Sequence, residues 1–445
     1  MYFGPMHPRI TEDTHFYDPS VAQICKVLWD HLCPKLRKLF MRLVILLILI
    51  SSPSFGGNFN KKSVPISIKP INFIVPSDVL TDFAKGSYQD KKKFCSASSN
   101  SVNLVASYSS GEREIPLSIK GYNSRMDNEQ DVPFANETGL FVLRMSEVIT
   151  DAWAFNDERK KEIALEALYQ WALHGGLLDT KSCSRNGILD LGCTEWTQPD
   201  GQDPSDSKDF ATVQMWVMKL ANGYFFALAE FQPGDPRHGI IQTWFDEFFN
   251  RNKKATAVYF GLDHGWFYPA ILDRLRKTES PKSLIKKLLK DLNRQVYVDG
   301  SMKDRTTRGN RALWYHHDAV KEALVSIEIA RTANVAIPEK LHAKISKAGV
   351  VFVNGYFDHS TLDKWAKKAH KAIYEPGKQD FKKNLNQMPN GHSWFYIFSY
   401  RNPDDPTAIK LDAMIRQRDN QAVKDGQIGF GLGCIYAVAK GGRDL

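Results

Sequence analysis

The 445-residue chain lacks several features that would assign it to a familiar class of binding protein. Its six cysteines form no Cys-x-x-Cys pair and no cluster with histidine, which argues against a structural zinc site. No repeat of fixed period is present, which argues against a regular solenoid. No basic run stands out beyond Lys91-Lys92-Lys93, so the net charge of +9 is dispersed. A dispersed positive charge favours an anionic partner and weakens the case for nucleic acid.

Long apolar runs are also scarce, and the clearest one lies at residues 43–50, between Arg42 and a small-residue pattern at Ser54-Phe55-Gly56. This run is too short to span a bilayer and is typical of the apolar region of a secretory signal. The sequence therefore predicts a signal peptide at residues 41–56 and a periplasmic or secreted protein without stable membrane insertion after cleavage. We expect translation to start at Met41, which would make residues 1–40 a misassigned or disordered extension. A buried apolar strand is the alternative for the run.

After signal cleavage, four cysteines remain, namely Cys95, Cys183, Cys193 and Cys434. An even number of cysteines in an exported protein suggests disulfide bonds, and four cysteines allow three pairings. Of these pairings, we favour a bond between Cys183 and Cys193, because the two residues flank a short loop.

Apolar residues recur at helical spacing from about residue 138 onward. Asn156 is a candidate cap for a helix that ends at Gly175-Gly176, and residues 208–231 have the composition of a second, very apolar helix. Further helices are predicted at residues 236–252, 254–277, 280–292, 313–334, 337–351, 361–371 and 408–440.

This succession of helices with little strand predicts an all-α fold. Many of the helices are apolar on more than one side, as expected when neighbours cover them. We expect an incomplete α/α toroid of antiparallel helix pairs at residues 136–445, although the same helices could build a bundle. Residues 57–135 are irregular and partly serine-rich, and we expect them to form an N-terminal arm around the main domain.

Two stretches concentrate chemically active side chains. Residues 308–317, RGNRALWYHH, combine two guanidinium groups, a phenol and two imidazoles immediately before an apolar helix. Upstream, residues 262–267, LDHGWF, place an acid and an imidazole beside aromatic rings. An aromatic core helix with a hydrogen-bonded histidine would explain the second stretch alone, but the two together suggest a reactive site.

The combined set suits β-elimination on a polymer of uronic acids. The C5 proton of a uronate lies next to a carboxylate, so its removal requires a group that neutralises the carboxylate, a base, and an acid at the glycosidic oxygen. Arginine can bind a carboxylate through two parallel hydrogen bonds. Tyrosine and histidine can exchange the protons where cationic neighbours favour the phenolate.

At these residues the sequence resembles the mannuronate-specific alginate lyases, a family with an α/α toroid fold. The resemblance is carried by Arg308-Gly309-Asn310-Arg311-Ala312-Leu313-Trp314-Tyr315-His316, preceded by the turn Asp299-Gly300-Ser301. Weaker similarity extends over residues 164–178 and 394–400. The resemblance implies a lyase that acts on an anionic polysaccharide, and we expect a monomer with neither metal nor cofactor.

The resemblance implies a role for each matching residue. Tyr315 would remove the C5 proton and return a proton to the leaving oxygen, while Arg308 beside it would stabilise negative charge. His264 would neutralise the substrate carboxylate or act as the base for the other epimer. Asp263 stands where the family has asparagine, and an ionised carboxylate there would repel an acidic sugar unless it is protonated or orients His264.

The remaining candidates for substrate binding are Arg311, Trp266, Trp314, His316 and Lys120, the last by alignment to a family lysine. Two of them have plainer interpretations, because Arg311 could form an ion pair within the scaffold and His316 could hydrogen-bond in the core. The neighbouring histidine at position 317 is expected on the helix surface.

Two other functions remain open. A glycoside hydrolase on the same architecture would pair Asp263 with a second carboxylate such as Glu230 or Asp299, although no pair has a recognised spacing. A non-catalytic sugar-binding or export protein would bind the polymer without turnover. The hydrolase would release reducing ends without an unsaturated product, and the binding protein would release neither.

Overall fold

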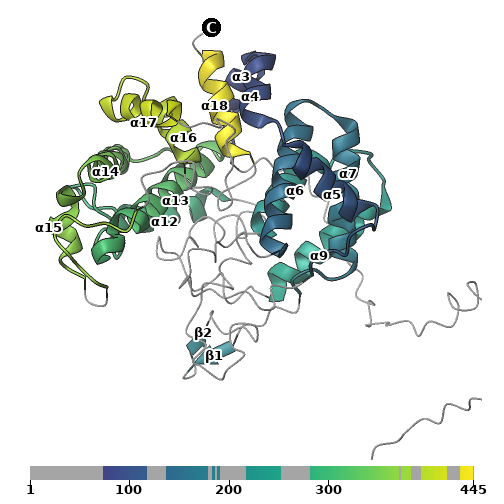
Figure 1. Cartoon of the computed structure of the whole chain (residues 1–445), viewed down its shortest axis with the longest axis horizontal. Helices are drawn as coiled ribbons and strands as arrows, with labels where there is room; N and C mark the ends of the chain where they lie inside the picture. The colour runs from purple at the N-terminus through teal and green to yellow at the C-terminus, as the bar shows by residue number, and fades with distance from the viewer. Residues whose placement is uncertain are drawn as a thin grey trace, which may run out of the picture. The chain divides into compact units, whose positions relative to one another are not determined.

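The computed structural model describes residues 74–117, 137–178, 183–185, 188–190, 217–251, 281–369, 372–381, 392–417 and 431–443. All of them belong to one compact unit that spans residues 68–445. These residues form an all-α fold, which confirms the predicted class (Figure 1). A single short antiparallel hairpin, β1 (Cys183–Arg185) with β2 (Ile188–Asp190), is the exception within the described part.

The helical elements of the described residues fall into two halves of the chain. The first half contains α3 (Ser77–Lys85), α4 (Tyr88–Cys95), α5 (Ser99–Ser109), α6 (Glu137–Ala154), α7 (Glu158–Leu173), the π-helix η1 (Tyr224–Leu228) and α9 (Pro236–Arg251). The second half contains α12 (Pro281–Gln295), η2 (Gly309–Arg311), α13 (Ala312–Thr332), α14 (Glu339–Phe357), η3 (His359–Leu362), α15 (Asp363–Ala366), α16 (Ser393–Arg401), α17 (Pro406–Arg416) and α18 (Leu432–Arg443).

Helices α5, α6, α7 and α9 pack against one another around large aromatic side chains (Figure 1). The ring of Trp171 in α7 lies 5.0 Å from that of Phe141 in α6 and 5.3 Å from that of Trp244 in α9. The indole nitrogen of Trp244 donates to the carbonyl of Gly176, 2.8 Å away. These contacts join three helices through one buried side chain, and edge-on aromatic pairs of this kind add to the burial of apolar area.

Helix α13 is buried over most of its length, and it contacts α12, α14 and α16. Every residue from 319 to 330 is buried, charged residues included. The carboxylate of Glu328 accepts hydrogen bonds from Arg401 of α16 and from Tyr436 of α18. A buried carboxylate is tolerated because these donors replace the water that it loses. The pairing therefore fixes α13 against two later helices.

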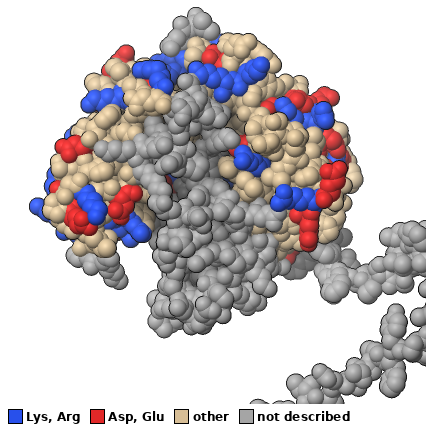
Figure 2. Space-filling view, viewed as in Figure 1, with Lys and Arg blue, Asp and Glu red and all other residues tan. Residues whose placement is uncertain are grey.

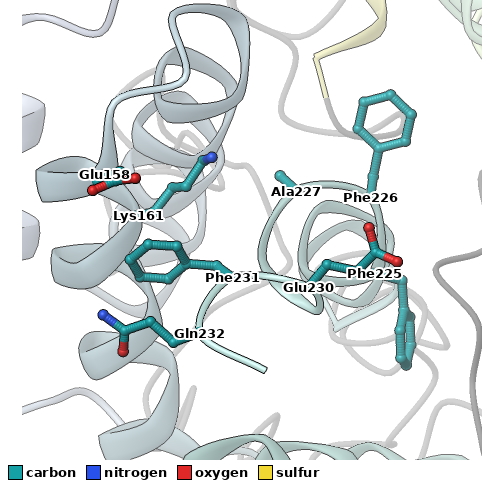
Figure 3. A pocket seen from close by; sticks show the side chains of 8 residues that line it. All are labelled: Glu158, Lys161, Phe225, Phe226, Ala227, Glu230, Phe231 and Gln232. Atoms are coloured by element: carbon teal, nitrogen blue, oxygen red, sulfur yellow. The ribbon is translucent and has the colours of Figure 1, made fainter. Parts of the chain in front are cut away.

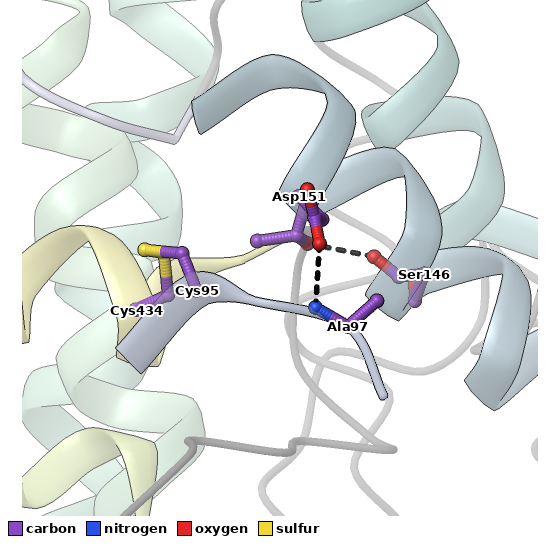
Figure 4. The surroundings of a disulfide bond; sticks show 6 residues. Cys95, Ala97, Ser146, Asp151 and Cys434 are labelled. Carbon is purple, nitrogen blue, oxygen red and sulfur yellow. Dashed lines mark hydrogen bonds between the residues drawn. A yellow bond between two sulfur atoms is a disulfide. The ribbon is translucent and has the colours of Figure 1, made fainter. Parts of the chain in front are cut away.

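Helix α18 closes the described unit by packing against α3, α4 and α16 (Figure 1). A disulfide bond joins Cys95 at the end of α4 to Cys434 in α18 (Figure 4). Just after α4, the backbone nitrogen of Ala97 donates to the buried carboxylate of Asp151, which also pairs with Lys160 at 2.7 Å. The ends of the described chain are thus attached to each other covalently and to α6 and α7 by hydrogen bonds. Among the four cysteines of the predicted mature chain, this bond leaves Cys193 as the one possible partner of Cys183. Cys193 lies outside the described residues, so the favoured Cys183–Cys193 bond stays a prediction.

The N-terminal arm predicted at residues 57–135 is not irregular where the structure describes it. Helices α3, α4 and α5 occupy this range, and Val79, Phe83 and Val105 are buried in the core. The serine-rich composition concealed α5, although its cap is itself a serine: the side chain of Ser98 accepts from the backbone nitrogen of Ser101.

Other predicted helices differ in their ends. Asp157, not Asn156, caps α7, because the Asp157 side chain accepts from Lys160 while Asn156 has a left-handed backbone at φ 52°. The helix predicted at residues 361–371 is reduced to η3 and α15. The helical stretch predicted at residues 408–440, with glycines breaking it, contains α17 and α18 in its described parts. Helix α16 was not predicted. The predicted signal peptide, the preceding extension and the helix at residues 254–277 lie outside the described residues.

Candidate functional site

The turn that precedes the RGNRALWYHH stretch is held by Asp299. Its carboxylate accepts from the backbone and hydroxyl of Ser301 and, from α15, from the indole nitrogen of Trp365 at 3.0 Å. Burial alone would raise the pKa of Asp299, but these hydrogen bonds and Lys364 outweigh it, so the pKa of this carboxyl lies below its usual value. Asp299 is therefore an ionised turn residue and does not suit the role of a general acid in a hydrolase.

Gly300 in the same turn has a left-handed backbone with φ +84° and lies directly against α14. A Cβ atom at this position would approach the backbone of Lys347 to 2.5 Å. Only glycine meets both conditions, which explains the central residue of the Asp-Gly-Ser turn.

The first half of the motif is anchored on residues 372–381. Gly309 has φ +58°, and a Cβ atom there would meet the carbonyl oxygen of Ile373 at 2.1 Å. Asn310 donates its backbone nitrogen to the same carbonyl, and its side-chain oxygen accepts from the backbone of Glu375. The side chain of Gln379 bridges the carbonyl of Gly309 and the backbone nitrogen of Leu313. The glycine and asparagine of the motif therefore shape the backbone that presents its neighbours.

Tyr315 and Arg308, the two residues assigned to chemistry, lie together. The guanidinium carbon of Arg308 is 5.0 Å from the centre of the Tyr315 ring. The Nε of Arg308 donates to the carbonyl of Asp304 at 2.8 Å, which fixes the base of the side chain. Both residues are half-buried. A second guanidinium, that of Arg305, lies 5.1 Å from the same ring.

His316 is completely buried and belongs to the core. Its Nε2 donates to the carbonyl of Ala348 in α14, and its Nδ1 is 2.9 Å from the hydroxyl of Thr306. That hydroxyl accepts from the backbone of Met302, so it donates to Nδ1. Burial lowers the pKa of His316 to about 4. Because both ring nitrogens are occupied and the side chain is inaccessible, we withdraw His316 as a substrate contact.

His317 is not on the helix surface as expected. Its ring is enclosed by Phe352, Phe381 and Trp394, and the indole nitrogen of Trp394 donates to its Nδ1 at 3.0 Å. Burial, helped by the nearby charge of Lys321, holds the pKa of His317 well below its usual range. The prediction was wrong because Phe352 of α14 and Trp394 of α16 cover the side of α13 that carries His317, which the sequence does not reveal.

Trp314 and Arg311, the other described candidates for substrate binding, face outward. Trp314 is 42% exposed, and its ring meets that of Phe381 edge-on at 6.5 Å. Arg311 is exposed at the start of α13. Both side chains are accessible next to Tyr315, as substrate-binding residues must be. Lys120, Asp263, His264 and Trp266 lie outside the described residues, so the structure places only the downstream half of the candidate site.

Glu230, a carboxylate considered for the hydrolase, lies in a different place. It lines a pocket of about 440 Å³ between α7 and the segment that follows η1 (Figure 3). Glu158 and Lys161 of α7 and Phe231 share the lining, and the ammonium of Lys161 lies 5.8 Å from the Phe231 ring centre. No lining residue of this pocket belongs to the RGNRALWYHH stretch.

Sequence reasoning missed Arg305 and the anchoring role of residues 372–381. For the first, a signal was available, because Arg305, Arg308 and Arg311 recur every third residue directly before α13. For the second there was none, since contacts between residues so far apart depend on the tertiary fold.

No group of three or more His, Cys, Asp or Glu side chains in the described part could hold a metal ion. Among the helices that the structure describes, none is both long and apolar enough to cross a bilayer.

No protein-family model matches the chain, and no curated protein matches it. The functional assignment therefore depends on the residues and their geometry.

Proposed function

We propose that the protein is a polysaccharide lyase that cleaves a polymer of uronic acids, such as polymannuronate, by β-elimination. The observation that carries the proposal is the Arg308–Tyr315 pair, in which a guanidinium lies 5.0 Å from the centre of a half-buried phenol ring. Of the rest of the stretch, Gly309 and Asn310 shape the turn, and Arg311 and Trp314 are exposed beside the pair. The remaining four residues are buried in the core, namely Ala312, Leu313, His316 and His317. That arrangement suits a site in which one base and one cation meet an acidic sugar.

The chemistry assigns one task to each group. Tyr315 as phenolate takes the C5 proton, the C5 electron pair forms the C4–C5 double bond, and the bond from C4 to the glycosidic oxygen breaks. The phenol then returns its proton to the leaving oxygen. Arg308 stabilises the negative charge that builds on the substrate carboxylate. Tyrosine can thus serve both proton transfers on one face of the sugar, with His264 and Asp263 assisting at the carboxylate.

The surface is compatible with a polyanionic substrate, because α12 carries a cluster of exposed lysines. Over most of the visible described surface, basic and acidic side chains are interspersed (Figure 2). On α12, Lys282, Lys286, Lys287 and Lys290 are exposed, and Asp291 is the one acidic residue of the helix. This helix leads directly into the turn that holds Arg305 and Arg308, because the backbone of Lys303 donates to the carbonyl of Gln295.

Export is part of the proposal. The Cys95–Cys434 disulfide supports a periplasmic or secreted location, since such bonds persist in oxidising compartments. We also propose that the helices form an incomplete α/α toroid, with the site at the end of the ring where residues 262–267 and 308–317 meet.

The direct test is to incubate the protein with mannuronate, guluronate and glucuronate polymers and follow the absorbance of unsaturated uronate. A lyase produces the chromophore on at least one of them. Reducing ends without the chromophore would favour a hydrolase, and polymer binding without either product would favour a non-catalytic protein.

A further inference from the structure

The guanidinium groups of Arg305 and Arg308 both lie against the Tyr315 ring, but the two side chains differ in their exposure to solvent. Arg305 is only 2% exposed, whereas Arg308 is half-buried and therefore partly accessible to solvent. We propose that Arg305 is a positioning residue that holds the Tyr315 ring and stabilises negative charge on its oxygen, which leaves Arg308 for the substrate carboxylate. The inference extends the proposed function, because only that function gives the phenol a task.

The position of Arg305 is fixed by backbone contacts that lead to α13. Its backbone nitrogen donates to the carbonyl of Met302, and Thr306 donates to the same carbonyl. The hydroxyl of Thr306 is hydrogen-bonded to His316, the residue after Tyr315 in α13. His316 in turn donates to Ala348 of α14. The turn that carries Arg305 and the helix that carries the phenol are therefore locked together by a buried chain of hydrogen bonds.

The geometry gives Arg305 a physical means of acting on the ring. A guanidinium within about 6 Å of an aromatic centre is attracted to the ring face, more strongly where water is excluded. The distances of 5.1 Å for Arg305 and 5.0 Å for Arg308 both meet this condition. Because water screens Arg305 less, its charge acts on the phenol more strongly than an exposed charge at the same distance.

A chemical measurement tests this coupling without any substrate. Tetranitromethane nitrates tyrosines through the phenolate, and peptide mass spectrometry resolves the rate at each position. We expect Arg305→Met to slow nitration of Tyr315 by at least about threefold relative to Tyr88, which is 64% exposed. Arg305→Lys should recover at least half of the rate. Lys303→Met, which removes an exposed charge two residues away, should leave the rate unchanged.

The same experiment reports whether each variant is folded. Tyr108 and Tyr436 are buried, at 2% and 0% exposure, and they react only if the core opens. If Tyr108 or Tyr436 reacts in Arg305→Met, that variant is not folded, and Arg305→Gln is tested in its place with the same two tyrosines as the folding control. Nitration of Tyr315 at the wild-type rate in a folded Arg305→Met or Arg305→Gln protein would overturn the inference.

Turnover separates the two arginines once an active polymer is known. Since buried Arg305 does not touch the polymer, Arg305→Met should lower kcat at unchanged KM, whereas Arg308→Met should also raise KM. An equal rise in KM for both variants would overturn the division of tasks. Failure of the wild type to act on any uronate polymer would instead refute the proposed function and leave the nitration result standing.

Discussion

At the scale of residues, the RGNRALWYHH stretch divides into scaffold and surface. Gly309, Asn310 and His316 shape or anchor the backbone, while Arg308 and Tyr315 remain partly accessible. The sequence predicted which residue types would gather here, because their chemistry is local. It could not predict which would be buried, since burial depends on neighbouring helices that lie far away in the chain.

Gly300 provides a test of the close approach between the Asp-Gly-Ser turn and α14. We expect Gly300→Ala to lower the free energy of unfolding by roughly 2–4 kcal/mol, because it combines a left-handed backbone with a backbone clash. Gly111 has a similar φ of +75° with nothing within 4 Å, so Gly111→Ala should cost about 1 kcal/mol. Urea denaturation of both variants measures the difference, and equal losses would show that the close approach is absent.

The burial of His316 makes the free energy of unfolding depend on pH. Burial lowers its pKa from 6.5 to about 4. Between these two pH values the unfolded chain binds a proton at His316 that the native protein does not bind. Stability is therefore complete above about pH 6.5 and falls as the pH drops towards 4, by up to about 3 kcal/mol from this residue.

The measurement is the free energy of unfolding at several pH values in wild type and His316→Gln. The variant should be less stable at pH 7.5, because it loses core hydrogen bonds, but its stability should decline less between pH 6.5 and 4.5. The buried His317 remains in both proteins, where burial and the charge of Lys321 hold its pKa low. Parallel curves for the two proteins would contradict the assignment.

At the scale of elements, the long helices were predicted best. Helices α9, α12 and α13 begin and end within a few residues of their predicted ranges. Helix α12 has separate apolar and lysine-rich sides, which is the pattern that marks a helix in sequence, whereas α13 is buried all round from residue 319 to 330 and was marked by its length. Helix α16 was missed because it is aromatic and buried on every side, which leaves no periodic pattern. Helices α3 to α5 were missed because they are short and rich in polar residues.

Helix α12 allows the polyanion part of the proposal to be tested. Its apolar side is buried through Ile285, Leu288 and Leu292, and its lysines occupy the opposite side. We expect the triple variant Lys282→Glu, Lys286→Glu and Lys290→Glu to weaken binding of a uronate polymer at low salt by about tenfold, with a smaller salt dependence.

A control variant changes the net charge equally without forming a cluster. It replaces the exposed lysines Lys92, Lys367 and Lys410 by glutamate, on or beside three separate helices. Binding measured by titration in increasing salt should change much less than for the α12 variant. If both variants lose the same affinity, only total charge matters and α12 has no special role.

At the scale of the whole molecule, α18 joins the two ends of the described chain. The sequence allowed three disulfide pairings, and loop length was the ground for favouring one of them, because pairing itself depends on which helices meet. The favoured Cys183–Cys193 bond is compatible with the observed Cys95–Cys434 bond but was chosen from loop length alone. Contact between α4 and α18 explains why cysteines 339 residues apart in sequence can bond.

The disulfide should contribute strongly to stability. A bond that closes so long a loop restricts the unfolded chain, and its removal is expected to cost about 4–5 kcal/mol. Thermal unfolding of the wild type and of the double variant Cys95→Ser, Cys434→Ser measures this loss. Adding a reductant should lower the Tm of the wild type towards that of the variant, and an unchanged Tm in the variant would show that the bond contributes little.

The central claim is that Tyr315 performs β-elimination on a uronate polymer, and one comparison tests it most directly. Wild type and Tyr315→Phe are incubated with polymannuronate while unsaturated product and polymer binding are measured in the same samples. The account predicts product from the wild type, a loss of at least about a hundredfold in the variant, and binding within about twofold of the wild type. Equal rates of product formation by the two proteins, or reducing ends without unsaturated product, would contradict it.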